Sequence, residues 1–270
     1  MRFAKYEGAG NDFILLDLRN GGATPQSAEI ARLCDRHFGI GADGLMTLAA
    51  SAVSGCDCSM RYYNADGSPG EMCGNGARCI ARYGYENGLS GETQRIETTA
   101  GLVTGQRVTK RLYKVRLNDP SVIDLHRSVS VGGTAYNCAY IELGDPGIPH
   151  AIVLMPDWDE RDHDMLRALG RALRFAKEFP RGANVSFVKV VDVGHVKAIT
   201  YERGVEDFTL ACGTGCGSTA CVLWKKGLLP GKRLTAQVPG GTLKLTIEGE
   251  TEVEKLLLEG PTEVAEILDI

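Results

Sequence analysis

Two short stretches with the same unusual composition lie 139 residues apart in the chain. They read Cys73-Gly-Asn-Gly76 and Cys212-Gly-Thr-Gly215, and each comes directly before a run of helical character. A thiol at a helix N-terminus has its pKa lowered from about 8.5, because the first turn carries partial positive charge. Two such thiols on two related halves would give one site with two acid/base faces, which is what inversion of a stereocentre requires.

The same two turns can also bind the anion that such chemistry creates. The α-proton of an amino acid is a weak acid, so its removal needs a nearby base and groups that stabilise the developing charge. Backbone N–H groups at Gly74–Gly76 and Gly213–Gly215 can hold a carboxylate. One cysteine as a thiolate would take the proton, and the other as a thiol would return one to the opposite face. No cofactor is required.

A lone cysteine is more often a small buried hydrophobic residue than a catalytic group. Two cysteines at equal positions of a repeat, each followed by Gly-x-Gly, favour the catalytic interpretation for Cys73 and Cys212. The other cysteines are interpreted as structural, and they are Cys34, Cys56, Cys58, Cys79, Cys138, Cys216 and Cys221.

The repeat extends beyond the two cysteine turns at the same offset. It relates Tyr62 to Tyr201, Gly88 to Gly227, Leu89 to Leu228 and Gly101 to Gly240. It also relates Asn64 to Arg203, each nine residues before its cysteine. A neutral amide on one half and a bidentate cation on the other would suit an asymmetric ligand with a remote carboxylate.

Short apolar runs between turn residues predict a chain dominated by strands. The predicted strands are 13–17, 45–48, 59–63, several within 95–117, 139–143, 151–154, 185–191, 196–201, 243–247 and 255–258. The predicted helices are 25–38 with Ser27 as N-cap, Cys73 to Asn87, 162–175 and 215–224. Residues 119–127 are predicted to be a connector. The glycine-rich string Gly39–Gly44 is interpreted as a loop, because a dinucleotide fingerprint needs a following helix and an acidic partner.

The fold predicted from these elements is α+β, with two similar domains related by a pseudo-twofold axis. Each domain would be a curved, largely antiparallel sheet around one central helix, with the active site in the cleft between the domains.

Composition excludes several classes of function. The net charge of −4 provides no basic patch for nucleic acid. No apolar run approaches a membrane span, and no signal peptide is recognised. Nine dispersed cysteines, an odd number, indicate a reducing cytoplasm rather than a disulfide scaffold. Cys56-Asp-Cys58 lacks the spacing and the second ligand pair of a zinc site, so no metal is expected.

At these residues the chain resembles the diaminopimelate epimerase family over essentially its whole length. The strings that carry the resemblance are Gly8-Ala-Gly-Asn-Asp-Phe13, Gly39-Ile-Gly-Ala-Asp-Gly44, Asn64-Ala-Asp-Gly-Ser68, Cys73-Gly-Asn-Gly-Ala-Arg-Cys79, Pro149-His150, Asn184, Glu202-Arg-Gly204 and Ala211-Cys-Gly-Thr-Gly215. The resemblance implies a cofactor-independent, two-cysteine enzyme that interconverts LL- and meso-diaminopimelate in lysine and peptidoglycan precursor synthesis.

The resemblance also implies a role for each matched residue. Cys73 and Cys212 would be the acid/base pair, and His150 and Glu202 would tune the thiols or position the reacting amine. The residues implied to hold the reacting carboxylate are Gly74, Asn75, Gly213 and Thr214. The residues implied to hold the distant amino-acid end are Asn11, Asn64, Asn184 and Arg203.

The implied organisation is an N-terminal domain of residues 1–118 with a returning segment 262–270, and a C-terminal domain of residues 119–261. A cytoplasmic homodimer acting on a small amino-acid substrate is expected, with no membrane or nucleic-acid partner.

Two residues depart from the family pattern. Ile148 stands where some members have an asparagine, and Phe208 stands where a polar residue is common. Both bear on substrate choice rather than on the two-base mechanism. A racemase of another amino acid, such as histidine, glutamate or a proline derivative, is therefore a second hypothesis; the retained Asn64, Asn184 and Arg203 argue against a short substrate. A thiol redox or metal-binding protein is a third hypothesis, but the chain has no Cys-x-x-Cys motif to support it. A pyridoxal-phosphate enzyme is a further option, but the sequence shows no persuasive combination of a lysine and a phosphate-binding loop.

Overall fold

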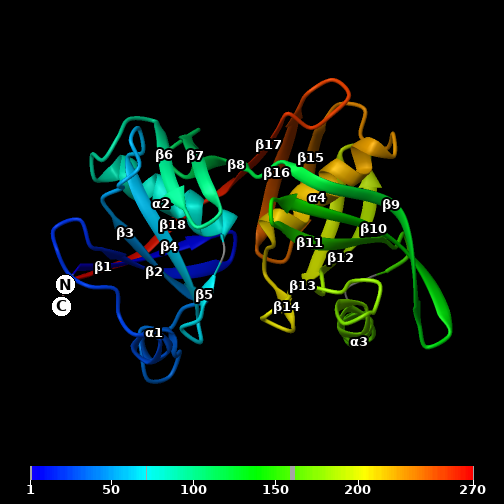
Figure 1. The fold of residues 1–270 in the computed structure, drawn as a ribbon, viewed down its shortest axis with the longest axis horizontal. Coiled ribbons are helices and arrows are strands. Elements are labelled where there is room, and N and C mark those ends of the chain that lie inside the picture. The colour runs from blue at the N-terminus through cyan, green and yellow to red at the C-terminus, as the bar shows by residue number, and fades with distance from the viewer. Residues whose placement is uncertain (1, 71, 159–161, 270) are drawn as a thin grey trace. The chain divides into compact units, whose positions relative to one another are not determined.

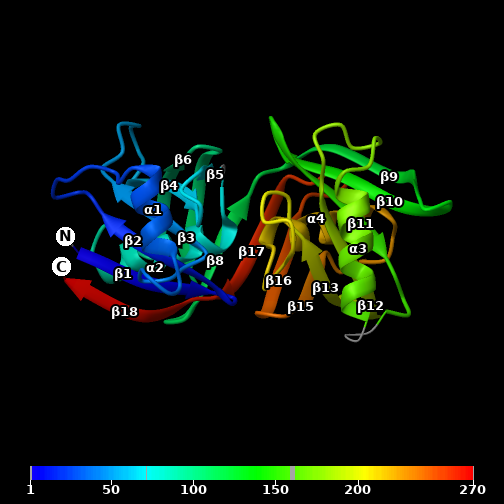
Figure 2. The same ribbon diagram turned by 90° about the horizontal axis from the view of Figure 1, so that it is seen from below.

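The structure is a computed structural model that describes residues 2–70, 72–158 and 162–269. The chain divides into two compact units (Figures 1 and 2). Unit 1 consists of Met1–Arg116 and Glu259–Ile270, and unit 2 consists of Leu117–Leu258. The first unit is therefore built from both ends of the chain.

Unit 1 is a mixed sheet with two helices. Its elements are β1 (Arg2–Gly8), β2 (Asn11–Asp17), α1 (Ser27–Cys34), β3 (Gly44–Ala49), β4 (Cys58–Asn64), β5 (Pro69–Gly70), α2 (Gly74–Glu86), β6 (Thr93–Thr98), β7 (Gly101–Arg107), β8 (Leu112–Leu117) and β18 (Glu263–Asp269). Strand β1 pairs with β18 and β2 in antiparallel fashion, and β2 pairs with β3 in parallel. Strand β4 is antiparallel to β3 and β5 and parallel to β6, which begins the antiparallel run β6–β7–β8.

Unit 2 repeats this plan. Its elements are β9 (Pro120–Val131), β10 (Thr134–Gly144), β11 (Gly147–Leu154), α3 (His163–Arg174), β12 (Asn184–Asp192), β13 (His195–Tyr201), β14 (Phe208–Thr209), α4 (Gly213–Lys225), β15 (Arg233–Val238), β16 (Gly241–Glu248) and β17 (Lys255–Pro261), which carries the chain back to unit 1. Strand β10 is antiparallel to β9 and β11, and β11 is parallel to β12. Strand β13 is antiparallel to β12 and β14 and parallel to β15, which is antiparallel to β16.

The two units therefore share one order of parallel and antiparallel pairings, element by element. In each unit one 13-residue helix, α2 or α4, lies among the strands, and a second helix, α1 or α3, lies to the outside (Figures 1 and 2). The predicted α+β class and the two-domain repeat are confirmed.

Close packing of the central helix against the strands depends on small residues. A Cβ added at Gly105 of β7 would lie 2.6 Å from Cβ of Ala81 in α2. A Cβ added at Gly76, in the first turn of α2, would lie 2.6 Å from Sδ of Met46. Both distances are below normal contact, so a larger side chain would push the helix from the sheet. The glycines of the cysteine turn thus have a packing role as well as a backbone role.

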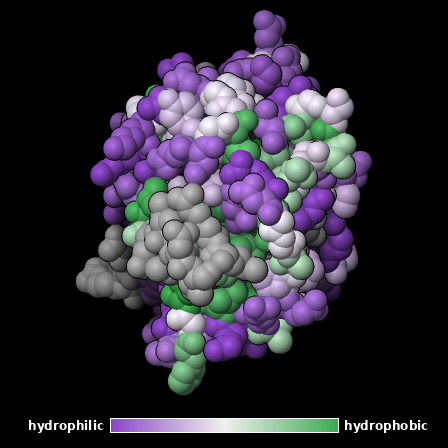
Figure 3. Space-filling model, turned by 90° about the vertical axis from the view of Figure 1, so that its left-hand side faces the viewer, coloured by the Kyte–Doolittle hydropathy of each residue, from purple (hydrophilic) through white to green (hydrophobic). Residues whose placement is uncertain are grey.

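Each outer helix covers its own apolar cluster. In unit 1 this cluster includes Ile14, Leu16, Ile30 and Leu45. In unit 2 it includes Leu166, Phe187 and Tyr201, all fully buried. On the molecular face in Figure 3, hydrophilic side chains predominate and hydrophobic ones gather in a patch in the lower half. Among the described residues, no helix is both long and apolar enough to cross a bilayer.

Three sequence predictions need correction. Residues 119–127 are not a connector, because most of them belong to β9, which pairs with β10. The first helix spans only Ser27–Cys34, and its N-cap is Gln26 rather than Ser27. The repeat offset changes after the helices, because the hairpin turn at Gly101 corresponds by pairing to Gly241 and not to Gly240.

Candidate active site

Cys73 and Cys212 occupy the same position in the two units. Each is the N-cap residue of its 13-residue helix, with extended backbone angles. Sγ of Cys73 accepts the backbone N–H of Gly76 at 3.4 Å, and Sγ of Cys212 accepts that of Gly215 at the same distance. The sulfur thus takes the capping role that a serine or aspartate oxygen usually has. All nine cysteines lie in the described ranges, and none forms a disulfide.

The expected lowering of the thiol pKa is wrong for Cys212. Burial raises the pKa of Cys212 well above its usual value, and the charge of Glu202 raises it further. Hydrogen bonds from Thr214 Oγ1, at 3.6 Å, and Gly215 N–H lower it by less. Removal of water from the thiolate therefore outweighs the helix N-terminus here. Cys212 is a thiol at neutral pH in this structure, whereas Cys73 is partly exposed.

Glu202 is held by the strand that precedes the second cysteine turn. Its backbone N–H donates to the carbonyl of Asp207, and Oε1 accepts from Thr209 Oγ1 at 2.5 Å. Thr209 was not recognised from the sequence, since its contact depends on the β13–β14 pairing. The sequence signal that could have identified Thr209 is its place three residues before Cys212.

Asn184 and Arg203 contact each other directly. Asn184 is buried, with 6% of the residue exposed. Its Oδ1 accepts the backbone N–H of Arg203 at 2.8 Å. The guanidinium of Arg203 donates to the carbonyl of Arg181 at 3.3 Å. Asn184 also pairs with His150 in the parallel ladder of β11 and β12. Three residues named from the sequence are thus adjacent in unit 2.

His150 is completely buried, and neither ring nitrogen has a hydrogen-bond partner among the described residues. Burial lowers the pKa of His150 to about 3, and the positive charge of Arg203 acts in the same direction. The imidazole is therefore neutral at physiological pH. It can donate through one ring nitrogen or accept through the other, and it cannot act as a cation.

In unit 1, Asn64 closes the turn at the end of β4. Its Nδ2 donates to Ser68 Oγ at 2.9 Å, and its backbone pairs with that of Ser68. Asn64 faces Gly44 in the ladder between β3 and β4. Asn64 is only partly buried.

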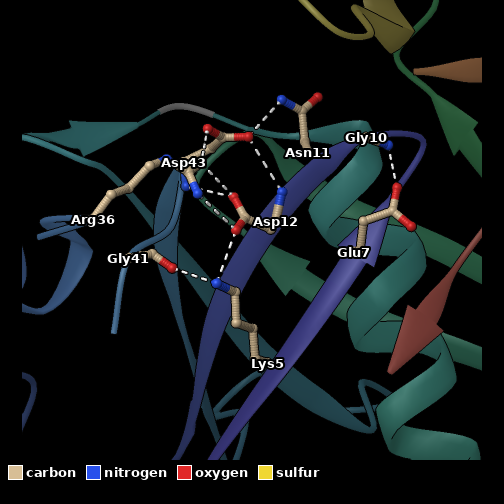
Figure 4. Close-up of polar contacts among 8 residues, drawn as sticks. All are labelled: Lys5, Glu7, Gly10, Asn11, Asp12, Arg36, Gly41 and Asp43. Carbon is tan, nitrogen blue, oxygen red and sulfur yellow. Dashed lines mark hydrogen bonds and ion pairs between the residues drawn. The ribbon is translucent and has the colours of Figure 1, made fainter. Parts of the chain in front are cut away.

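Asn11 and Asn75 are joined by a hydrogen bond. Nδ2 of Asn75 donates to Oδ1 of Asn11 at 2.7 Å. Nδ2 of Asn11 donates to Oδ2 of Asp43 at 3.0 Å (Figure 4). Gly74 precedes Asn75 as the first helical residue and is buried. In unit 2, Gly213 and Thr214 hold the corresponding positions.

The two departures from the family pattern differ in environment. Ile148 lies in the β10–β11 hairpin opposite Leu143 and is partly exposed. Phe208 packs its ring edge-on against Phe187 and Tyr201, in the apolar cluster of unit 2. Phe208 therefore serves packing, although it is partly exposed like Ile148. Within the described ranges, no group of three or more His, Cys, Asp or Glu side chains is arranged to hold a metal ion.

Solved structures share the fold over the whole chain. The structure of a probable proline racemase from Agrobacterium radiobacter K84 superposes with a TM-score of 0.78 at 15% identity, covering 100% of this chain and 92% of that one. A hydroxyproline epimerase from Agrobacterium vitis gives a TM-score of 0.76 at 16% identity, covering 99% and 91%. At such low identity these likenesses establish the fold alone.

Sequence relatives are closer. A diaminopimelate epimerase of Aquifex aeolicus is 36% identical over 266 residues, covering 94% of this chain and 92% of the relative. One from Caldanaerobacter subterraneus is 37% identical over 239 residues, covering 82% and 83%. The family model for diaminopimelate epimerase matches residues 3–121 and 144–263. Fold and relatives together define an amino-acid epimerase. The chain belongs to the diaminopimelate epimerase family.

Proposed function

We propose that this chain interconverts LL- and meso-diaminopimelate by a two-base mechanism without a cofactor, in the synthesis of lysine and peptidoglycan precursors. The observation that carries the proposal is the equal geometry of Cys73 and Cys212. Each thiol caps a 13-residue helix and accepts the N–H of the residue three positions later at 3.4 Å. Two equivalent thiols of this kind supply the acid and the base that inversion at one carbon needs.

In the proposed reaction the two thiols act on opposite faces of the α-carbon. One cysteine, as the thiolate, removes the α-proton, and the bond electrons move toward the substrate carboxylate. The other cysteine, as the thiol, delivers its proton to the opposite face. The enzyme ends with the two protonation states exchanged, so atoms and charges balance. The raised pKa of Cys212, due to burial, supports that residue as the proton donor in the resting state.

The substrate carboxylate next to the reacting carbon would lie at the helix N-termini. Gly74 and Asn75 begin one helix, and Gly213 and Thr214 begin the other. The N–H groups of these turns and the partial positive charge of the helix ends stabilise the dianionic intermediate. Stabilisation of charge that develops during the reaction accelerates the chemical step rather than binding alone.

The distant amino-acid end would be held by polar side chains from both units: Asn11, Asn64, Asn184 and Arg203. Arg203 supplies a cation for a remote carboxylate, and Asn184 fixes the backbone from which Arg203 extends. Glu202 and neutral His150 would position the reacting amine. The proposed domains are residues 1–118 with 262–270, and residues 119–261. The proposed form is a cytoplasmic homodimer.

The test is incubation of the reduced protein with LL-diaminopimelate in heavy water, without added cofactor. Meso product with deuterium at the inverted centre is the expected result. Cys73→Ala and Cys212→Ala should each abolish inversion, whereas Cys221→Ala, a change at a buried cysteine inside α4, should leave it intact as the matched control. Near wild-type turnover in either of the first two variants would refute the two-base assignment.

A racemase of another amino acid is the second candidate, and partly exposed Ile148 is the observation that favours it. No reaction with LL-diaminopimelate, but exchange with proline, glutamate or histidine, would select it. Ile148→Asn should then move activity toward diaminopimelate.

A further inference from the structure

A line of four polar side chains runs through unit 1 to the first turn of α2. Asp43 accepts from Nδ2 of Asn11 at 3.0 Å, and Oδ1 of Asn11 accepts from Nδ2 of Asn75 at 2.7 Å. Oδ1 of Asn75 accepts from the guanidinium of Arg78 at 3.0 Å. These residues come from the loop before β3, from β2 and from α2. We call this line the amide relay.

The two ends of the amide relay fix the direction of every bond in it. An ionised carboxylate only accepts hydrogen bonds, and a guanidinium only donates them, whereas an asparagine amide can turn over and exchange its oxygen and nitrogen. With Asp43 at one end, Asn11 must present its nitrogen there and its oxygen to Asn75. With Arg78 at the other end, Asn75 must present its oxygen there and its nitrogen to Asn11. Neither amide can turn over without placing two donors or two acceptors face to face.

We propose that Asp43 and Arg78 are positioning residues that set the orientation of Asn11 and Asn75 toward the carboxylate-bearing substrate. The inference rests on the proposed function, in which these two amides contact the substrate. In the orientation set by the amide relay, Nδ2 of Asn11 donates to Asp43 and has a second N–H for a carboxylate oxygen. A turned-over amide would present its oxygen instead and repel the anion.

Both ends of the amide relay are themselves fixed. Asp43 forms an ion pair with Arg36 at 2.7 Å, and its Oδ2 also accepts the backbone N–H of Asp12 at 3.2 Å (Figure 4). Asp12 in turn pairs with Arg36 and Lys5. Burial alone would raise the pKa of Asp12, but hydrogen bonds from Arg36 and Lys5 hold it below its usual value. The carboxylates at this end are thus compensated by two cations.

Arg78 anchors the opposite end. It is 0% exposed, and a second guanidinium nitrogen donates to the carbonyl of Gly74 at 3.3 Å. A buried charged group costs free energy unless it is hydrogen-bonded, so its position is well determined by these contacts. Because Gly74 and Asn75 begin α2, Arg78 ties the start of the helix to the amide that extends from it.

At the corresponding positions of the second cysteine turn, unit 2 has residues that cannot form the same line. The positions of Asn75 and Arg78 correspond to Thr214 and Gly217. A Cβ added at Gly217 would lie 2.7 Å from Cδ1 of Leu117, so a long side chain does not fit there. The amide relay therefore distinguishes the two otherwise similar cysteine turns.

The first test needs no substrate. Protein labelled with ¹⁵N-asparagine gives side-chain NH₂ signals, and the signals of Asn11 and Asn75 are identified by their loss in Asn11→Asp and Asn75→Asp. We expect Asp43→Asn, which keeps the shape but removes the acceptor-only end, to speed hydrogen exchange at the Asn75 amide about tenfold, two links away. Asp35→Asn is the matched control, because the Asp35 carboxylate accepts from the backbone N–H groups of His37 and Phe38 and is not part of the amide relay. Unchanged exchange at Asn75 in Asp43→Asn would refute the relay.

The second test uses epimerisation of LL-diaminopimelate by the intact enzyme. Asp43→Asn and Arg78→Lys should each raise KM about tenfold with less than about threefold loss of kcat, since binding rather than proton transfer is disturbed. The double variant should be little worse than either single variant, because both act through one line. Unchanged KM, or a loss of kcat that follows a lower melting temperature, would refute the positioning role. An inactive wild type with the expected exchange would instead contradict the proposed function and leave the relay established.

Discussion

Oδ1 of Asn184, at the start of β12, accepts the backbone N–H of Arg203, in the turn after β13, at 2.8 Å, so two distant segments of the chain meet at the candidate site. A buried side chain here fixes the backbone that carries the proposed cation for the distant carboxylate. Loss of the Asn184 amide would free the backbone of Arg203 and would also remove a polar group from the proposed site, so stability and the proposed substrate binding should change together.

Asn184→Ala is expected to lower the free energy of unfolding by about 1 kcal/mol, the usual contribution of one hydrogen bond, and to raise KM about tenfold. Asn184→Asp keeps an oxygen acceptor for Arg203 N–H and should retain more stability, while it loses the amide N–H and still raises KM. Urea unfolding and steady-state kinetics on the same preparations check both. Equal KM in all three proteins would contradict the binding role.

Thiol accessibility gives a prediction about the order of chemical modification. Of the nine cysteines, only Cys56 and Cys73 are partly exposed, and the other seven are buried. Because burial also raises the pKa of Cys212, brief iodoacetamide treatment at neutral pH should modify Cys56 and Cys73 before Cys212.

Peptide mass mapping against time, together with activity, checks this order. In a Cys56→Ala background the loss of activity should follow modification of Cys73 one for one. Modification of Cys212 at the same rate as Cys73 would show that Cys212 does not stay buried in solution.

The packing of α2 against β7 predicts that replacement of one glycine in β7 lowers stability. Gly105→Ala would place a methyl group 2.6 Å from Cβ of Ala81, and neither atom can rotate away. We expect the free energy of unfolding to fall by about 1–3 kcal/mol, as for other overpacked cores. Gly91→Ala is the matched control, because a Cβ there meets nothing within 4 Å. Unfolding of the two variants by heat or denaturant measures the difference in stability. Equal stability of Gly105→Ala and Gly91→Ala would contradict the tight contact between Gly105 and Ala81.

Local sequence signals predicted most elements because they depend on residues close together in the chain. The cysteine turns were found from the glycines around Cys73 and Cys212, and both helices begin there. Residues 119–127 were misassigned because β9 is polar and half exposed, and its strand character arises from pairing with β10. The family class follows from motifs spread along the whole chain.

Contacts between distant segments were the part that local patterns did not reveal. Asp43 was visible only as one letter of a glycine-rich string, and its contact with Asn11 depends on the β2–β3 pairing. The pKa of Cys212 was predicted in the wrong direction, because the helix end is evident in sequence but the burial is not. Burial in the folded chain and strand pairing therefore determine the pKa of Cys212 and the contacts of Asp43.

The buried neutral imidazole of His150 predicts a pH dependence of stability. Its pKa is lowered to about 3 by burial and by Arg203, whereas an exposed histidine titrates near 6.5. As the pH falls through this interval the unfolded chain takes up a proton that the folded chain does not, so unfolding becomes more favourable. The stability associated with His150 is complete above pH 6.5 and declines toward pH 3, by up to about 1.4 kcal/mol per pH unit.

His150→Gln should remove this contribution, so its unfolding free energy should fall less steeply than that of the wild type between pH 6.5 and about 4. His195→Gln, a change at an exposed histidine, should keep the wild-type slope. Urea unfolding at several pH values measures the slopes directly, and the comparison of slopes is insensitive to any constant loss of stability in a variant. Since each variant differs from the wild type at one histidine, a smaller slope in His150→Gln alone reports the buried imidazole. Identical slopes in the wild type and His150→Gln would mean that His150 binds its proton equally in the folded and unfolded states, and so is hydrated in solution.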